Sequence, residues 1–326
     1  MQILMSDSGY ARIGERLKAM RTALDVITMD TSGALRRGSE AVDSIDAEVF
    51  WASLDMFTSR ALPAFFAHML EGTKGKWVQV FSAGIDNPVF KSIMAKGIRL
   101  SKSSAQAPAI AEYVMSHALS LLHPIDAQRE AQGAHAWKRI FYREIASTRW
   151  LIVGFGAVGT EIANRLQPFG MHLTVVRRNT GALQHVANVR PTSDLVALLP
   201  DADVVVLACA LNDETRGIAG EKFFTAMKPG SVLINIGRGG LVDEDALKSG
   251  LDRDQPARAV LDVFQTEPLP ADAWFWDHPK IRVTAHCSSI GDGVLGRGDE
   301  LFLENLRRYR AGEPLLNEAS LREVGL

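Results

Sequence analysis

The sequence predicts an α/β protein with two domains, each built on a parallel sheet. Segments that suit buried strands alternate with segments that suit helices along most of the chain. The chain has 326 residues, 47% of them hydrophobic, so it can bury a large core, and this length favours two domains over one. A glycine turn between a strand and a helix, near the middle of the chain, is typical of the same fold class.

Composition excludes several classes of protein. Lys and Arg number 36 against 38 Asp and Glu, so no overall positive charge attracts nucleic acid or an anionic membrane. Two cysteines, Cys209 and Cys287, are too few for a disulfide framework and fit a reducing compartment. The longest apolar run, residues 204–211, is far shorter than the roughly 18 residues of a membrane helix, and the N-terminus lacks a signal-peptide pattern. These features predict a cytoplasmic protein without nucleic-acid or membrane partners.

The first third of the chain reads as one α/β unit. Strands are expected at residues 2–7, 25–30, 48–53, 76–84 and 98–104, separated by helical segments such as 62–70. A longer helix follows at 108–124, because Pro108 suits a first helical turn and Pro124 stops the helix. Residues 125–148 are polar and mixed, and we expect a connecting arm there.

A strand, glycine turn, helix and second strand then follow in TRWLIVGFGAVGTEIANRLQPFGMHLTVVRRNT, residues 148–180. In the turn, GFGAVG, Gly154 permits the tight bend, Gly156 lets the backbone approach a pyrophosphate, and Gly159 lets the helix pack close to the strand. The phosphates would bind free N–H groups at the helix N-terminus. A GxGxxG alone is a weak signal, but this strand and helix context makes it a strong prediction of a dinucleotide site.

Two adjacent arginines, Arg177 and Arg178, stand at the end of the second strand, and no acid is near them in the sequence. At this place an acid usually binds the ribose 2′-hydroxyl of NAD, whereas an arginine accommodates the 2′-phosphate of NADP. We therefore expect both arginines to select NADP(H), with NAD(H) still possible. The alternative is a pair of solvated charges at a strand end.

Three later segments place polar residues directly after apolar strands. Residues 228–247 contain Arg238, residues 258–270 contain Asp262 and Glu267, and residues 281–289 contain His286. The carboxyl ends of strands in an open α/β sheet line the ligand crevice. An arginine can clamp a carboxylate, and a histidine beside an acid can donate a proton, so the set suits reduction of a 2-oxo acid.

These motifs resemble those of a known family. GFGAVG, INIGRGGLVDEDAL, DVFQTEPLP and TAHCSS occur in the order and at the spacing of the D-isomer-specific 2-hydroxyacid dehydrogenases, and within that family most resemble the glyoxylate/hydroxypyruvate reductases. The motifs cover most of residues 80–290.

The resemblance implies roles for individual residues. Arg238 would bind substrate, and Glu267 would pair with His286, the acid/base. Asp262 would hold the nicotinamide carboxamide, and the backbone amides of Ala83 and Gly84 would receive the substrate carboxylate. Taken together, the residues expected at the cofactor are Gly154, Phe155, Gly156, Ala157, Val158, Gly159, Arg177, Arg178, Asn179, Cys209, Ala210, Thr215, Ile236, Gly237, Arg238, Asp262 and His286.

The resemblance also implies an architecture of two Rossmann-like or flavodoxin-like domains. A substrate domain would comprise residues 1–105 and 288–326, and a dinucleotide-binding domain, residues 106–287, would be inserted in it. Such proteins are usually homodimers joined through the cofactor domain. Trp137 is similar to an arm aromatic that reaches the neighbouring active site in some reductases, but an ordinary interface or core aromatic is an equal alternative.

Some positions depart from the family pattern or have no clear motif. Ala285 and Cys287 flank the histidine where proline and an apolar residue are usual, and Ala210 and Asn212 alter a cofactor-facing loop. Cys287 is more readily explained as an inert small side chain than as a redox group. In the segment 51–57, the residues expected to border the substrate are Leu54, Met56 or Phe57. The remaining histidines have no metal-ligand spacing, so no metal site is expected.

The mechanism predicted from these residues is NADPH-dependent reduction of a 2-oxo acid to a D-2-hydroxy acid, with the proton from His286. Two alternatives stay open. One is an NAD-linked dehydrogenase of the same family that works in the oxidative direction. The other is a dinucleotide-sensing corepressor, because such relatives keep the same three polar residues.

Overall fold

The computed structural model describes residues 1–20, 23–57, 59–183, 186 and 188–326. The chain forms two compact units, unit 1 (Met1–Gln106 with Asp292–Leu326) and unit 2 (Ala107–Gly291). The sequence placed these two boundaries after residues 105 and 287. Each unit has its own sheet, and unit 2 is inserted in unit 1, so the predicted α/β fold class is confirmed.

None of the helices in the described residues has the length and apolar content needed to span a bilayer.

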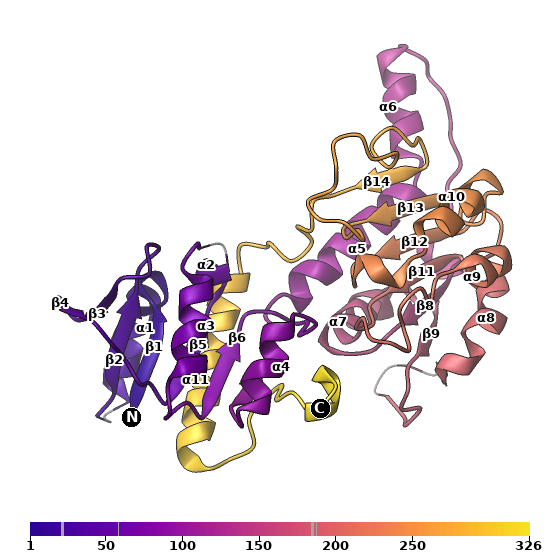
Figure 1. Cartoon of the computed structure of the whole chain (residues 1–326). Coiled ribbons are helices and arrows are strands. Elements are labelled where there is room, and N and C mark those ends of the chain that lie inside the picture. Colours follow the sequence, from indigo (N-terminus) through magenta and orange to yellow (C-terminus); the bar gives the residue numbers. More distant parts are fainter. Residues whose placement is uncertain (21–22, 58, 184–185, 187) are drawn as a thin grey trace. The chain divides into compact units, whose positions relative to one another are not determined.

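Unit 1 has a sheet with the strand order β4-β3-β2-β1-β5-β6-β7 (Figure 1). The strands from β2 to β7 in that order are parallel, whereas β3 and β4 form an antiparallel hairpin at one edge. The predicted strands are all present, but the sequence reading missed this short hairpin. The strands are β1 (Gln2–Ser6), β2 (Asp25–Met29), β3 (Leu35–Arg37), β4 (Glu40–Val42), β5 (Val49–Ala52), β6 (Trp77–Val80) and β7 (Arg99–Ser101).

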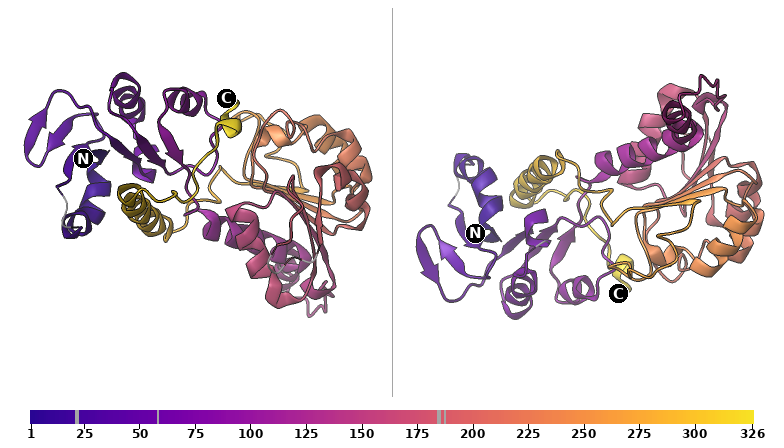
Figure 2. Two further views of the ribbon diagram at one scale, coloured as in Figure 1. Left: turned by 90° about the horizontal axis from the view of Figure 1, so that it is seen from below. Right: turned by 90° about the horizontal axis from the view of Figure 1, so that it is seen from above.

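Helices cover both faces of the unit 1 sheet (Figure 2). On one face, α11 comes from the C-terminal part of the chain and packs beside α1, and Phe302 of α11 stacks on Trp51 with 4.6 Å between ring centroids. On the other face, α3 and α4 cover a second apolar cluster. The helices are α1 (Asp7–Ala19), α2 (Leu54–Phe57), α3 (Leu62–Glu71), α4 (Pro88–Ala95) and α11 (Val294–Ala311), with a 3₁₀ turn η6 (Leu321–Val324).

Unit 2 has a fully parallel sheet with the order β10-β9-β8-β11-β12-β13-β14. The chain moves outward from β8 to β9 and β10, then returns to the other side of β8 with β11. The direction of winding therefore reverses between β8 and β11, and ligands bind at such a point in open α/β sheets. The strands are β8 (Arg149–Val153), β9 (His172–Val176), β10 (Asn188–Arg190), β11 (Val204–Leu207), β12 (Val232–Asn235), β13 (Arg258–Leu261) and β14 (Ile281–Val283).

Apolar clusters on both faces of this sheet hold the helices of unit 2 in place. α5 and α7 cover one face, and α8, α9 and α10 cover the other. The predicted arm contains a helix, α6, none of whose residues is buried. The helices are α5 (Ala107–Leu122), α6 (Ile125–Gly133), α7 (Ala157–Leu166), α8 (Leu195–Leu198), α9 (Glu221–Ala226) and α10 (Glu244–Asp252), with 3₁₀ turns η1 (Ile145–Ser147), η2 (Gln167–Phe169), η3 (Thr192–Asp194), η4 (Leu199–Asp201) and η5 (Gly239–Leu241).

Candidate active site

The glycine turn lies between β8 and α7, at the point where the winding of the unit 2 sheet reverses. Gly154 has a φ of +95°, and a Cβ there would lie 2.5 Å from backbone atoms of Cys209. A Cβ on Gly159 would lie 2.7 Å from the carbonyl oxygen of Gly154, so this glycine lets α7 pack close to the turn. A Cβ on Gly156, by contrast, would meet no described atom within 4 Å. The open side of Gly156 fits a pyrophosphate at the N-terminus of α7.

Arg177, Arg178 and Asn179 follow β9 directly. The backbone N–H of Arg177 donates to the carbonyl of Arg190 over 3.0 Å, which fixes the backbone at the strand end. Arg178 Nη1 lies 3.7 Å from Glu214 Oε2, and the two side chains are 61% and 62% exposed. The sequence shows no acid near Arg178, but in the folded chain a loop distant in sequence brings Glu214 beside it. Such an exposed pair contributes little to stability, so Arg178 can exchange Glu214 for another anion at low cost.

The loop that carries Glu214 follows β11 and includes Ala210 and Thr215. Asn212 Oδ1 accepts hydrogen bonds from the backbone N–H groups of Glu214 and Thr215 at 2.9 and 3.1 Å. Thr215 Oγ1 donates to the carbonyl of Ala210 over 2.7 Å. These hydrogen bonds fix the conformation of the loop after β11. It is the loop in which Ala210 and Asn212 depart from the family pattern. Cys209 lies at its start, and burial raises the pKa of its thiol to about 11, so it stays protonated at neutral pH.

Arg238 stands on the loop after β12, next to Ile236 and Gly237. The fully buried Asn235 shapes this loop, because its Oδ1 accepts from the Gly237 N–H at 3.1 Å and its Nδ2 donates to the Arg238 carbonyl at 3.0 Å. A Cβ on Gly239 would lie 1.9 Å from the carbonyl carbon of Phe264. Only glycine allows this approach, and the loop of Arg238 is consequently pressed against the loop that leads to Glu267.

Glu267 and His286 are joined directly. His286 Nδ1 lies 2.8 Å from Glu267 Oε2, while Glu267 Oε1 accepts the backbone N–H of Phe264 at 2.9 Å. The carboxylate is therefore fixed from one side and orients the imidazole on the other. The His286 side chain is 46% exposed, so it is accessible from solvent. The strands β12, β13 and β14 are neighbours in the sheet (Figure 1), and the loops that follow their carboxyl ends carry Arg238, Glu267 and His286.

The hydrogen-bond partners of Asp262 could not be identified from the sequence. Its side chain is fully buried, and its oxygens accept hydrogen bonds from Thr284 Oγ1 at 2.6 Å, Cys287 N at 2.8 Å and Ser288 N at 3.0 Å. The residue therefore holds the turn that carries His286. Its expected contact with the nicotinamide carboxamide stays a prediction.

In unit 1, Ala83 and Gly84 lie on the loop after β6. Ala83 is exposed and Gly84 half-buried, and within the described residues neither backbone N–H donates a hydrogen bond. The Ser82 hydroxyl donates to the Gly84 carbonyl and braces the loop. Two unbonded amides on a braced loop can receive an anion such as a carboxylate.

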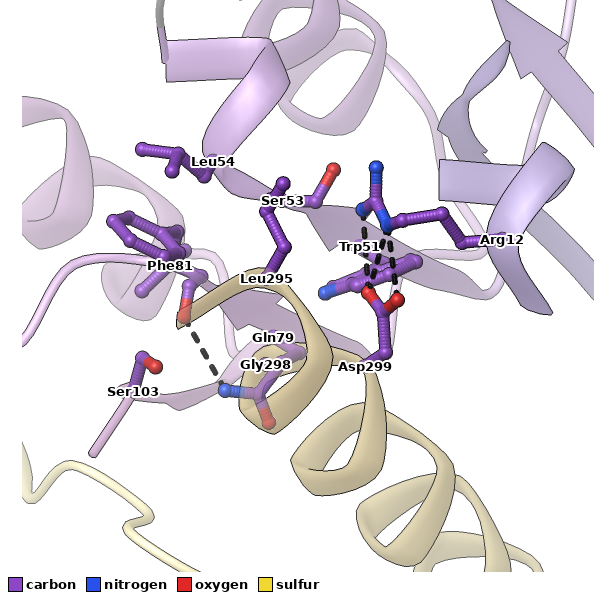
Figure 3. A pocket seen from close by; sticks show the side chains of 11 residues that line it. Arg12, Trp51, Ser53, Leu54, Gln79, Phe81, Ser103, Leu295, Gly298 and Asp299 are labelled. Atoms are coloured by element: carbon purple, nitrogen blue, oxygen red, sulfur yellow. Dashed lines mark hydrogen bonds and ion pairs between the residues drawn. The ribbon is translucent and has the colours of Figure 1, made fainter. Parts of the chain in front are cut away.

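A cavity in unit 1 begins at the same loop (Figure 3). Leu54, Phe81 and Leu295 lie on one side of it, and on the other Arg12 Nε binds Asp299 Oδ2 at 2.9 Å. The space inside is about 10 Å³, room for about one water molecule. Of the other two expected substrate neighbours, Met56 is 1% exposed and belongs to the core, and Phe57 packs against that core. Ser53, Leu54, Phe81 and Ser103 all stand just beyond the carboxyl ends of β5, β6 and β7.

The arm of unit 2 exposes aromatic side chains. Trp137 and Phe141 are each 97% exposed and Tyr142 is 55% exposed. Figure 1 shows α6 and the segment after it standing away from the unit 2 sheet. Trp137 is therefore not a core residue within this chain.

Comparison with known proteins agrees with this geometry. The family model for the NAD binding domain of D-isomer specific 2-hydroxyacid dehydrogenases matches residues 115–288, more than half of the 326 residues. Glyoxylate/hydroxypyruvate reductase A of Serratia proteamaculans is 28% identical over 68% of this chain and 74% of its own length. A glyoxylate/hydroxypyruvate reductase of Arabidopsis thaliana is 28% identical over 74% and 75% of the two chains.

Solved structures are similar over almost the whole chain. A D-isomer specific 2-hydroxyacid dehydrogenase from Xanthobacter autotrophicus, in complex with NADPH and MES, is 26% identical with a TM-score of 0.80 and covers 99% of this chain and 98% of its own. A family protein from Aeromonas salmonicida is also 26% identical, with a TM-score of 0.76 and 98% coverage of both chains. The chain therefore belongs to the D-isomer specific 2-hydroxyacid dehydrogenase family, and it is an NAD(P)-dependent enzyme of that family.

Proposed function

We propose that this enzyme reduces a 2-oxo acid to the D-2-hydroxy acid and prefers NADPH to NADH. The observation that carries the reaction is the pairing of Glu267 with His286 at 2.8 Å, and the loop that leads to Glu267 packs against the loop of Arg238. Unit 2 serves as the cofactor domain and unit 1 as the substrate domain in this proposal.

The chemistry divides among a few residues. A bound nicotinamide cofactor supplies the hydride that is transferred to C2 of the oxo acid. Arg238 and the amides of Ala83 and Gly84 hold the substrate carboxylate, because a guanidinium fork and free N–H groups both suit that anion. Glu267 holds Nδ1 of the imidazole, so Nε2 of protonated His286 delivers the proton to the carbonyl oxygen as the hydride arrives. The oxygen becomes a hydroxyl and His286 is left neutral.

The cavity of unit 1 supports a small substituent on the substrate. Phe81, at the start of the loop that also carries Ala83 and Gly84, lines it together with Leu54 and Leu295, and the space holds about one water molecule. A hydrogen or a substituent of about one heavy atom fits such a space, whereas a phenyl ring does not. This observation favours small 2-oxo acids over those with an aromatic substituent.

The test is consumption of NADPH and, separately, NADH by the purified protein with glyoxylate, hydroxypyruvate, pyruvate and phenylpyruvate. We expect kcat/KM for one of the two smaller polar acids to exceed that for phenylpyruvate at least tenfold. Turnover of phenylpyruvate at an equal rate would contradict the small pocket. Oxidation of a hydroxy acid with NAD alone would favour the oxidative alternative, and cofactor binding without any turnover would favour a sensor.

We further propose that the arm, residues 125–148, binds a second copy of this chain to form a homodimer. α6 has no buried residue, and Trp137 and Phe141 are almost fully exposed. A short helix without a buried residue is marginal in water, and large exposed apolar side chains are typical of interfaces. The family resemblance points to a symmetric dimer as the occupant.

Sedimentation equilibrium measures this association directly. We expect the wild-type protein to sediment as a dimer at micromolar concentration and the Phe141→Asp variant to shift toward the monomer. Phe169→Asp is the matched control, because Phe169 is also exposed, at 42%, but lies outside the arm. A wild-type monomer, or equal effects of both variants, would contradict the proposed interface.

A further inference from the structure

A chain of side-chain hydrogen bonds links helix α5 to the turn that carries His286. Tyr113 Oη, on α5, lies 2.7 Å from Thr284 Oγ1, which donates to Asp262 Oδ1 over 2.6 Å. A carboxylate can only accept hydrogen bonds, so the single hydroxyl proton of Thr284 is donated to Asp262. The hydroxyl oxygen of Thr284 must therefore accept the hydrogen bond that Tyr113 donates. Burial raises the pKa of Tyr113, so its hydroxyl keeps this proton at any pH of interest. The direction of the chain is therefore fixed from Tyr113 to Asp262.

Asp262 fixes the turn on both sides of His286. Its carboxylate accepts the N–H groups of Cys287 and Ser288, and its backbone carbonyl accepts the His286 N–H at 2.8 Å. Asp262 has no exposed surface, so these groups of the protein take the place of water as hydrogen-bond donors to its carboxylate. A buried carboxylate keeps its position only while its hydrogen-bond partners are satisfied.

His286 needs such support because of its backbone. Its φ is +49°, in the left-handed region that residues with a Cβ rarely adopt. The hydrogen bonds around His286 must hold this conformation. Residues with a strained backbone are common at functional sites, where their neighbours maintain the strain. A small relaxation of the turn would move the imidazole away from Glu267, 2.8 Å distant.

We propose that Tyr113 is a positioning residue for His286, acting through Thr284 and Asp262. Tyr113 does not itself take part in proton transfer; its hydroxyl completes the set of donors that keeps the turn in its strained form. This inference rests on the proposed role of His286 as the proton donor. A purely structural role, in which Tyr113 only ties α5 to the end of β14, is the alternative that the experiment must separate.

The experiment compares Tyr113→Phe, Thr284→Val and Thr284→Ser in the full-length enzyme. Tyr309→Phe is the matched control, because it removes a partly buried tyrosine hydroxyl that donates to Glu48 in unit 1 at 2.7 Å. For Tyr113→Phe and Thr284→Val we expect kcat to fall about tenfold, with KM for the oxo acid and the Kd for NADPH within about twofold, since a misplaced group affects the chemical step. Thr284→Ser should restore turnover, and Tyr309→Phe should leave it unchanged.

Two further measurements make the result decisive. The double variant Tyr113→Phe/Thr284→Val should be no slower than the worse single variant, because both break one chain of bonds. Hydrogen exchange at the Cys287 and Ser288 amides should accelerate in both single variants, and this readout does not depend on turnover. A kcat of Tyr113→Phe equal to that of Tyr309→Phe, or a double variant whose loss is the product of the two single losses, overturns the proposal. If wild-type protein reduces no oxo acid but the exchange rates rise as expected, the proposed function has failed and the hydrogen-bonded support has not.

Discussion

Replacing His286 by glutamine is expected to lower kcat for oxo acid reduction by about two to four orders of magnitude, the usual contribution of a positioned general acid. Glutamine has nearly the reach of histidine and can still bond Glu267, but its amide cannot deliver a proton. The Kd of NADPH should stay within about twofold, because the glycine turn and Arg177 are untouched. Stopped-flow turnover and fluorescence titration of the cofactor measure the two quantities separately.

Glu267→Gln provides the partner experiment. Glu267 Oε1 accepts the Phe264 N–H and Oε2 lies beside the His286 ring, so an amide keeps the shape and removes the negative charge next to the imidazole. We expect a loss of kcat intermediate between wild type and His286→Gln, because the amide can still bond the imidazole but no longer places a negative charge beside it. Turnover of His286→Gln at near wild-type rate would remove His286 from the proposed mechanism, whatever Glu267→Gln does.

Local patterns predicted the parts of this site that depend on neighbours in the sequence. The bend at Gly154 and the polar residues after β12, β13 and β14 follow from the order of strand, turn and helix, and the sheet order then brings those strand ends together. The sequence pattern did not predict helix α6, because none of its residues is buried. It therefore lacks the apolar periodicity by which helices are recognised. The β3–β4 hairpin was missed although Gly38, with a φ of +60°, sits at a short polar turn that is a hairpin signal.

Contacts between distant loops could not be predicted in the same way. Nothing near Arg178 in the sequence indicates Glu214, because their approach depends on how the loops after β9 and β11 are closed. Similarly, Asp262 looks like a cofactor ligand in its motif, but only the folded chain shows that Thr284, Cys287 and Ser288 occupy its oxygens. Hydrogen-bond partners of a buried acid are a tertiary property, so the motif alone did not reveal this support of His286.

Replacing both Arg177 and Arg178 by alanine should raise KM for NADPH between tenfold and a hundredfold and change KM for NADH less than about twofold. A hydrogen bond to a charged group contributes roughly 1.5–3 kcal/mol, and about 1.4 kcal/mol corresponds to a factor of ten. Only the 2′-phosphate distinguishes the two cofactors, so the loss is confined to NADPH. Initial rates at a saturating concentration of the same oxo acid give both constants.

Glu214 makes this experiment sharper. Its carboxylate lies 3.7 Å from Arg178, so in the proposed complex it would compete with the 2′-phosphate for that guanidinium. Glu214→Gln should therefore lower KM for NADPH modestly, the opposite direction to the arginine double variant, and leave NADH unaffected. Arg178 and Glu214 are exposed and Arg177 is half-buried, so neither change removes a residue of the core, and folding should be preserved. Equal effects on NADPH and NADH in the double variant would mean that the arginines are solvated strand-end charges, and the acid beside Arg178 would then have no bearing on the choice of cofactor.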